Sequence, residues 1–299
     1  MDEQELERAR ESACAAILAR CARAEISPAI AVMEMLIAAG SPAAVLASTR
    51  AHRGSEPSIR EVLRLLDEHA AGAGKVAAML EGVLDSPPYN ASPAESVAFS
   101  KRLFDWSVTQ SEEASVALYS LGSADLLAEA TSEIALRLQS FGVLDPARSA
   151  LDIGCGIGRI EVALAPRLRA IHGIDVSPKM IEAAARRCAG LANVSLALSS
   201  GLDLADLGSA AFDLVLAVDS FPYLVQAGAA LVRAHFHEVA RVLARGGDFV
   251  ILNFAYDRSL AQDRADVRAL ADESGLAVVI DGEAPFTLWN ARAFVLAKP

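Results

Sequence analysis

The sequence predicts an α/β protein in which a mostly parallel β-sheet is covered by helices on both faces and is preceded by a helical domain. Three observations support this fold class. Residues 3–84 are rich in helix-forming Ala, Leu, Glu and Arg, residues 85–93 contain three prolines, and the chain beyond residue 149 alternates short β-rich runs with helical segments. Strands that alternate with helices form parallel sheets covered on both faces. The 299 residues, 53% of them hydrophobic, suffice for two domains and exclude disorder as the main state.

Local signals place helices within residues 1–84. Ser27 and Ser41 each precede a proline, which favours a helix start because the serine hydroxyl can accept a free backbone N–H and proline has none. Gly40 is suited to end the helix between them. Apolar residues at helical spacing predict another helix over residues 57–69. We therefore interpret residues 1–84 as a helical bundle of the size of a lid or a dimerisation unit, and we expect any homodimer to use these helices.

The proline-rich residues 85–93 (DSPPYNASP) are expected to form a linker, since they cannot adopt regular structure. Residues 94–299 then form the second domain, which begins with helical segments over residues 94–106 and 124–138. Its predicted strands are residues 150–153, 170–174, 194–198, 212–218, 248–253, 277–280 and 293–296.

Residues 151–160 (LDIGCGIGRI) lead from an apolar strand through three alternate glycines into a helix. Glycine permits a tight turn and lets a ligand approach the backbone where a Cβ would collide. Asp175 ends the next strand, and an acidic residue there can accept hydrogen bonds from both hydroxyls of a ribose. Together these two features predict a nucleoside pocket at the carboxyl end of the sheet.

The spacing of the glycines argues against a dinucleotide, because the third glycine of G-x-G-x-x-G would fall at Arg159. The pattern D-x-G-x-G-x-G over residues 152–158, followed by Asp175, resembles the cofactor loop of class I S-adenosylmethionine-dependent methyltransferases. Residues 212–219 resemble the fourth strand of that family, and residues 241–252 resemble its helix end, Gly-Gly turn and fifth strand. The resemblance covers about residues 115–299 and implies a doubly wound, seven-stranded sheet whose last strand is antiparallel.

The resemblance implies that the protein binds S-adenosylmethionine and releases S-adenosylhomocysteine. The glycines would pack under the methionine and ribose, Asp152 would help hold the methionine amino group, and Asp175 would bind the ribose hydroxyls. An acidic residue usually follows the third strand in this family, but residues 199–202 are SSGL here, so we take Gly201 and Leu202 as the adenine contacts. The cofactor-binding candidates implied in this way are Tyr119, Asp152, Gly154, Cys155, Gly156, Gly158, Asp175, Val176, Met180, Gly201, Leu202, Asp219 and Ser220.

Residues 219–223 (DSFPY) occupy the position of the family's acceptor-facing loop. Asp219 and Tyr223 are therefore candidate catalytic residues, and the alternative is a plain strand-ending turn. His235 and His237 are further candidates for a general base, although two residues apart they cannot share a helix face. For these histidines a place on the helix surface or in the core is the alternative.

Charge and cysteine content restrict the partners. With 27 Lys and Arg against 38 Asp and Glu, the net charge of −11 disfavours binding to nucleic acid. The four cysteines form no C-x-x-C pair and no metal-ligand spacing, so we expect neither a disulfide framework nor a metal. Residues 1–10 are charged, unlike a signal peptide, and the longest apolar stretch in the first half is too short to span a bilayer. We expect a cytoplasmic protein that does not bind membranes.

These inferences lead to two hypotheses of different classes. The first is an S-adenosylmethionine-dependent methyltransferase that moves the methyl group to a small-molecule acceptor by in-line displacement, with the acceptor atom (N, O, C or S) left open. A protein or nucleic acid acceptor is the alternative within that class. The second hypothesis is a non-catalytic scaffold that keeps the methyltransferase fold, against which the intact glycines and Asp175 argue.

Overall fold

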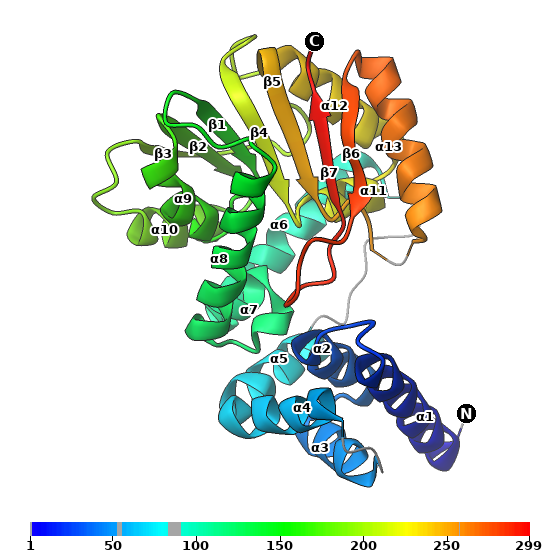
Figure 1. The fold of residues 1–299 in the computed structure, drawn as a ribbon. Helices are drawn as coiled ribbons and strands as arrows, with labels where there is room; N and C mark the ends of the chain where they lie inside the picture. The colour runs from blue at the N-terminus through cyan, green and yellow to red at the C-terminus, as the bar shows by residue number, and fades with distance from the viewer. Residues whose placement is uncertain (1, 53–55, 83–90, 257) are drawn as a thin grey trace. The chain divides into compact units, whose positions relative to one another are not determined.

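A computed structural model describes residues 2–52, 56–82, 91–256 and 258–299 (Figure 1). The described chain divides by contacts into two compact units. The helical unit consists of residues 1–86, 106–130 and 286–290, and the sheet unit of residues 87–105, 131–285 and 291–299. Most of the predicted linker, residues 85–90, lies outside the described residues.

The helical unit is built mainly from the α-helices of the first part of the chain. Its elements are α1 (Glu3–Ala22), α2 (Pro28–Ala39), α3 (Pro42–Ala51), α4 (Pro57–Glu68), α5 (Ala70–Gly82), α7 (Glu112–Val116) and the 3₁₀ turn η1 (Leu118–Ser120). Helices α6 (Pro93–Gln110) and α8 (Ala124–Ser140) contribute residues to both units.

The expected helix starts and stop within the first part of the chain are confirmed. The hydroxyls of Ser27 and Ser41 accept hydrogen bonds from the N–H groups of Ile30 and Ala44, at 3.1 and 3.2 Å. Gly40 ends α2 in the left-handed conformation at φ +76°, which glycine adopts at no steric penalty. The two serines and the glycine thus mark these helix ends as the local sequence predicted.

The sheet unit contains seven strands with helices between them. The strands are β1 (Ser149–Ile153), β2 (Ala170–Asp175), β3 (Val194–Leu198), β4 (Phe212–Val218), β5 (Leu243–Leu252), β6 (Ala277–Glu283) and β7 (Ala293–Ala297). The connecting helices are α9 (Arg159–Leu164), the 3₁₀ turn η2 (Ala165–Arg167), α10 (Pro178–Arg187), α11 (Phe221–Ala227), α12 (Ala229–Val242) and α13 (Leu260–Ser274).

The strand order is β3-β2-β1-β4-β5-β7-β6, and β7 runs antiparallel to both of its neighbours. The other neighbouring pairs are parallel, so the predicted doubly wound sheet with an antiparallel last strand is confirmed. Because the order reverses between β1 and β4, the carboxyl ends of these two strands border the crevice where ligands bind in open α/β sheets.

Helices lie on both sides of this sheet, with α9 and α10 against β2 and β3, and α12 and α13 against β5 and β6 (Figure 1). The main hydrophobic core includes Val215 of β4, Phe249 of β5 and Phe236 of α12, each 0% exposed. Alternate residues of a strand point to opposite faces, so Asp152 of β1 faces away from Leu151 and Ile153, which belong to this core.

The start of β5 differs from the prediction. Residues 246 and 247 were expected in a turn before the strand, but β5 already begins at Leu243. The two glycines are held by the residue that follows β7, since the Gly246 N–H donates to the Lys298 carbonyl at 2.8 Å and the Lys298 N–H to the Gly247 carbonyl at 2.9 Å. Pairing with the chain end therefore extends the strand through residues whose local preference is for a turn.

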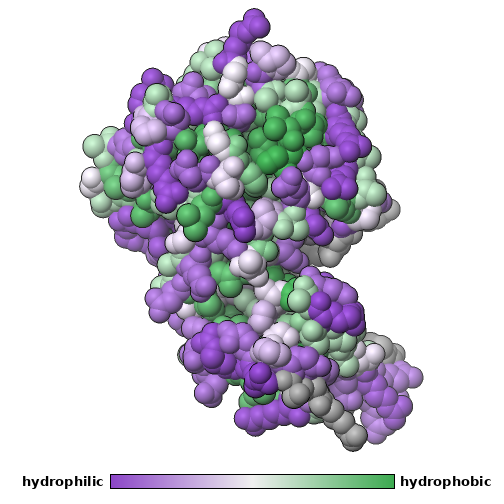
Figure 2. Space-filling view, viewed as in Figure 1, coloured by the Kyte–Doolittle hydropathy of each residue, from purple (hydrophilic) through white to green (hydrophobic). Residues whose placement is uncertain are grey.

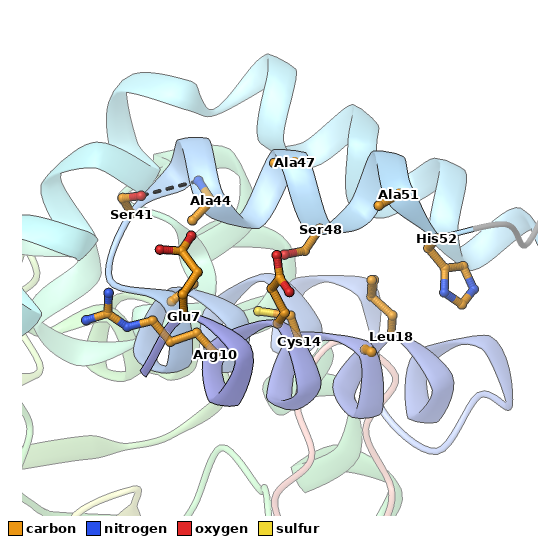
Figure 3. Close-up of a pocket in the computed structure, with 13 residues that line it drawn as sticks. Glu7, Arg10, Cys14, Leu18, Ser41, Ala44, Ala47, Ser48, Ala51 and His52 are labelled. Carbon is orange, nitrogen blue, oxygen red and sulfur yellow. Dashed lines mark hydrogen bonds between the residues drawn. The ribbon is translucent and has the colours of Figure 1, made fainter. Parts of the chain in front are cut away.

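Hydrophilic residues cover much of the surface in view, with one compact hydrophobic cluster in the upper right of Figure 2. In the part of the chain that the structure describes, no single helix has both the length and the apolar composition needed to cross a membrane, whereas α2 and α3, bent by 114°, pass that test only as a pair. A groove of about 880 Å³ lies between α1 and α3 (Figure 3). Five alanines line it together with Cys14, Leu18, two serines and the polar or charged side chains of Glu7, Arg10, Glu11 and His52. None of the candidate site residues lines it.

Candidate functional site

The glycine loop between β1 and α9 adopts a conformation that depends on glycine. Gly154, Gly156 and Gly158 have φ values of +80°, +54° and +78°, in the left-handed region that side chains other than glycine rarely adopt. A Cβ on Gly154 would lie 2.5 Å from the Cβ of Ser220, and one on Gly158 would lie 2.9 Å from the sulfur of Cys188. Both the backbone conformation and the close packing of this loop thus require glycine.

The loop is attached to the acidic residue that ends the next strand. The Gly156 N–H donates to one oxygen of Asp175 and the Ser177 N–H donates to the other, both at 2.9 Å. The N–H groups of Gly154 and Cys155 both donate to the Ile174 carbonyl, at 2.8 and 3.0 Å. The loop and the carboxylate, predicted from the sequence to meet at one place, therefore form one hydrogen-bonded unit.

Asp175 is 8% exposed, and burial is the main reason that its pKa is raised. Hydrogen bonds from the backbone of Ser177, Gly156 and Val176 act in the opposite direction by stabilising the carboxylate. An ionised carboxylate offers about four acceptor sites, so acceptor capacity for a hydroxyl group remains after these three backbone bonds are counted.

Two further carboxyl groups are buried beside the loop. Asp152 of β1 is 1% exposed and Glu161 of α9 is 0% exposed. Burial raises the pKa of both, and the proximity of each carboxyl group to the other adds to this effect for Glu161. Arg159, which donates to the Thr131 hydroxyl at 3.1 Å, lowers the pKa of Asp152 in part. The side wall of the loop is therefore a buried, acidic cluster with one cation at its edge.

Asp219 follows β4 at the same edge of the sheet, in a left-handed backbone conformation with φ +59°. Its Oδ1 accepts hydrogen bonds from the Asn253 amide at 2.7 Å and from the Tyr256 hydroxyl at 3.0 Å. Burial raises the pKa of Asp219 to about 6, against the effect of these two donors and of Arg159. At pH 7 its carboxylate is ionised but close to its pKa, which is the condition that suits a general base.

Two tyrosines lie beside Asp219, and further aromatic contacts extend from them. The ring of Tyr223 packs edge-on against Phe104 of α6, with ring centroids 4.9 Å apart, and against Tyr256, with centroids 6.0 Å apart. Burial raises the pKa of the Tyr223 hydroxyl, as does the charge of Asp219. Ser220, next to Asp219, has a buried hydroxyl oxygen with no hydrogen-bond partner among the described residues. The structure thus brings Asp219, Ser220 and Tyr223 together at one end of the sheet.

Helix α6 forms another wall of the site within the sheet unit. Asp105 accepts hydrogen bonds from the Ser177 hydroxyl at 2.6 Å and from the Lys179 N–H at 3.3 Å. A Cβ on Gly201 would lie 2.6 Å from Val176 and 2.9 Å from Val97 of α6. Val176 and Gly201, two of the predicted adenine contacts, are therefore neighbours.

The remaining predicted residues lie in different surroundings. Met180 is buried in α10, Cys155 is buried in the loop, and Leu202 is 37% exposed. Tyr119 belongs to the helical unit, where its ring stacks on Trp289 with centroids 6.0 Å apart.

The two histidines of α12 are not brought to Asp219. His235 is 1% exposed, and its Nδ1 lies 3.0 Å from the Leu231 carbonyl of the same helix. Burial lowers its pKa, and the charged groups that act on it are Asp203 and Glu238. His237 is exposed on the same helix. Their contacts are those of a core residue and a surface residue.

Several residues that the structure places at the site were not predicted from the sequence: Asp105, Arg159, Glu161, Asn253 and Tyr256. Asn253 and Tyr256 follow β5, the neighbour of β4, so their position after a predicted strand could have indicated a role. Glu161 carries a signal of another kind, as it is a carboxylate that lies among the apolar residues of 157–164 (IGRIEVAL). Asp105 and Arg159 have no local signal, because only the tertiary fold brings their partners near.

Residues 150–247 match the sequence model of a family described as methyltransferase domain. Demethylmenaquinone methyltransferases from two strains of Tropheryma whipplei, Twist and TW08/27, are each 32% identical to this chain over 108 residues, which are 36% of this chain and 42% of theirs. The chain therefore spans less than half of the length of these curated relatives.

Two solved structures share the fold over about two thirds of this chain. Magnesium protoporphyrin IX methyltransferase from Synechocystis PCC 6803 with bound S-adenosylmethionine has a TM-score of 0.51 and 18% identity, and the match covers 68% of this chain and 97% of that one. Phosphoethanolamine N-methyltransferase 1 from Haemonchus contortus, in complex with phosphoethanolamine and S-adenosylhomocysteine, has a TM-score of 0.51 and 15% identity, and the match covers 69% and 49% of the two chains.

Proposed function

We propose that the sheet unit belongs to the class I S-adenosylmethionine-dependent methyltransferases and that the chain transfers a methyl group from S-adenosylmethionine to a small-molecule acceptor. The observation that carries the proposal is the bond from the Gly156 N–H to the Asp175 carboxylate. It joins the loop that would lie under the ribose to the acid that would bind the ribose hydroxyls.

The side chains at the loop fit such a cofactor. Asp175 retains acceptor capacity for a ribose hydroxyl after its backbone bonds are counted. The Asp152 carboxylate is buried with Glu161 as its neighbour, and the Ser220 hydroxyl is buried without a hydrogen-bond partner among the described residues, so they could bind an ammonium and a carboxylate, respectively. Val176 and Gly201 would border the adenine. Buried polar atoms without partners are rare in folded proteins and point to a missing ligand group.

When bound, S-adenosylmethionine would supply a methyl group already activated by the positive sulfur. The chain's task is then to align the acceptor with that methyl group and to exclude water, and alignment alone can contribute roughly 7–11 kcal/mol to lowering a barrier. Phe104, Tyr223 and Tyr256 would form the apolar wall on the acceptor side. No further chemical group is needed for an acceptor that carries a free lone pair.

An acceptor that must lose a proton needs a base, and Asp219 is suited to accept it. Asn253 and Tyr256 donate to the same carboxylate oxygen, Oδ1, which leaves the second oxygen able to accept a proton from the acceptor. The acidic chain supports a small acceptor rather than a nucleic acid. The names of the relatives, which act on demethylmenaquinone, magnesium protoporphyrin IX and phosphoethanolamine, also support a small acceptor.

The proposal is tested by calorimetric titration of S-adenosylhomocysteine into the full chain, followed by mass-spectrometric detection of methylated products from a panel of quinols, porphyrins, amines and thiols. We expect saturable binding and methyl transfer to at least one class. Binding without transfer to any small molecule, protein or nucleic acid tested would favour the scaffold hypothesis. If S-adenosylhomocysteine does not bind at any pH, both the methyltransferase proposal and the scaffold hypothesis are refuted.

A further inference from the structure

The carboxyl groups of Asp152 and Glu161 are buried against each other beside the glycine loop. The two carboxyl groups lie within hydrogen-bonding reach of each other, and no described residue outside this pair is a hydrogen-bond partner of their four oxygens. Space for Glu161 is provided by Gly173 of β2, which is paired in register with Asp152. A Cβ on Gly173 would lie only 2.5 Å from Oε1 of Glu161. The fold therefore makes room for a second carboxyl group next to Asp152.

Two ionised carboxylates cannot remain in contact in a buried site, because their mutual repulsion and the loss of hydration act together. A shared proton removes the conflict: one group keeps it and donates a hydrogen bond to the other. Arg159 and Asp175 act on the pair, and the thiols of Cys155 and Cys188 face it, since the charge of Glu161 raises the pKa of both. Arg159 is the cation among them, and it favours the ionised form of Asp152.

We propose that Glu161 is a positioning residue that keeps its proton and donates a hydrogen bond to Asp152, and so fixes the orientation of the carboxylate that would hold the amino group of the cofactor. This inference rests on the proposed function. It assigns two different roles to two neighbouring carboxyl groups: Asp152 carries the charge and Glu161 supplies the proton that makes this charge tolerable at a buried position.

The first test measures the affinity for S-adenosylhomocysteine by calorimetry at about pH 8.5 in the wild type and two variants. Glu161→Gln keeps a donor of similar shape, so its affinity should stay within about threefold of the wild type. Glu161→Leu removes the donor, and its affinity should fall roughly tenfold or more, since one hydrogen bond to a charged group is lost. Glu182→Gln, on the exposed face of α10, is the matched control and should bind like the wild type.

Equal affinities in Glu161→Gln and Glu161→Leu, whether both retained or both lost, would overturn the positioning role. If circular dichroism shows that Glu161→Leu does not fold, the affinity of Glu161→Gln alone tests the proposal. A tenfold loss of affinity in Glu161→Gln would contradict it, because the amide can donate the same hydrogen bond.

The second test needs no ligand. A carboxyl group with a raised pKa in the folded state gives stability at low pH that is lost as the pH rises through that pKa. The free energy of unfolding, measured by urea denaturation from about pH 5 to 8, should therefore fall less steeply with pH in Glu161→Gln than in the wild type and in Glu182→Gln. Parallel profiles would overturn the shared proton. If the wild type binds no S-adenosylhomocysteine, both the proposed function and the role of Glu161 in cofactor binding are refuted. The shared proton is then tested separately, by the pH dependence of the free energy of unfolding.

Discussion

Replacing Asp175 should have two separable effects, on cofactor affinity and on stability. In Asp175→Ala the ribose hydroxyls would lose their charged acceptor, which should weaken binding of S-adenosylhomocysteine by about 1.5–3 kcal/mol, or roughly 10- to 150-fold. The backbone N–H groups of Gly156 and Ser177 would also lose their acceptor. A buried donor left without a partner costs about 1–3 kcal/mol, so the two together should lower the free energy of unfolding by about 2–6 kcal/mol.

Asp175→Asn separates the contributions, because its single side-chain oxygen can replace only one of the two carboxylate oxygens. Its loss of stability should therefore be about half of that in Asp175→Ala, or about 1–3 kcal/mol. Asp206→Ala, at an exposed position of the same unit, is the control and should leave both quantities unchanged.

The assay is calorimetric titration of S-adenosylhomocysteine combined with urea denaturation of each variant, with circular dichroism to show that each variant is folded at the titration temperature. Wild-type affinity in a folded Asp175→Ala would refute the placement of the ribose. Equal stability of the Asn and Ala variants would refute the assignment of one backbone bond to each carboxylate oxygen.

Three further predictions concern the acceptor side and the core. For an acceptor that must lose a proton, Asp219→Asn should lower kcat/KM by about 10²–10⁴-fold. In the wild type, kcat/KM should fall as the pH drops below about 6, where the Asp219 carboxylate becomes protonated. A flat pH profile would exclude Asp219 as the base. Tyr256→Phe removes a hydrogen bond that lowers the pKa of Asp219, so the acidic limb of the kcat/KM profile should move to higher pH, and a shift to lower pH would contradict the contact. Gly173→Ala would place a Cβ 2.5 Å from Glu161 and 2.9 Å from Cys155. Urea denaturation should show that the free energy of unfolding falls by about 1–3 kcal/mol because of overpacking. A gain in stability would show that the neighbouring side chains can move to accommodate the methyl group.

Much of the fold could be predicted because its signals are local. The cap at Ser27, the left-handed Gly40 and the apolar runs of the strands depend on residues that lie close together in the chain. The arrangement of the strands came instead from the order of elements, which resembles a known family. Gly154, Gly156, Gly158 and Asp175 could be predicted to meet because the first two strands of such a sheet are neighbours, and the structure joins them through Gly156.

The rest of the site could not be predicted because its contacts are not local. Asp105 bonds to Ser177 from 72 residues earlier in the chain, and Asn253 bonds to Asp219 across 34 residues. Helix α6 presents Asp105 and Phe104 to the site, but the sequence of that helix shows only that it is a helix. The burial of Glu161 could not be predicted either, because a carboxylate in a short helix is ordinarily exposed. Its buried position depends on the absence of a side chain at Gly173, a residue of another element.

The contacts of α6 also bear on how the site is assembled as the chain is made. Val97, Phe104 and Asp105 are translated before the glycine turn, and Tyr256 and Asn253 after the last residue of the family match. A segment of residues 150–247 alone would therefore contain the glycine turn. It would lack the contacts from α6 and the two residues that donate hydrogen bonds to Asp219. Since α6 must wait for Ser177 and Tyr223 to emerge from the ribosome, loops of 70 residues or more have to close before the pocket exists. Binding competence should consequently be among the last properties the chain acquires on folding.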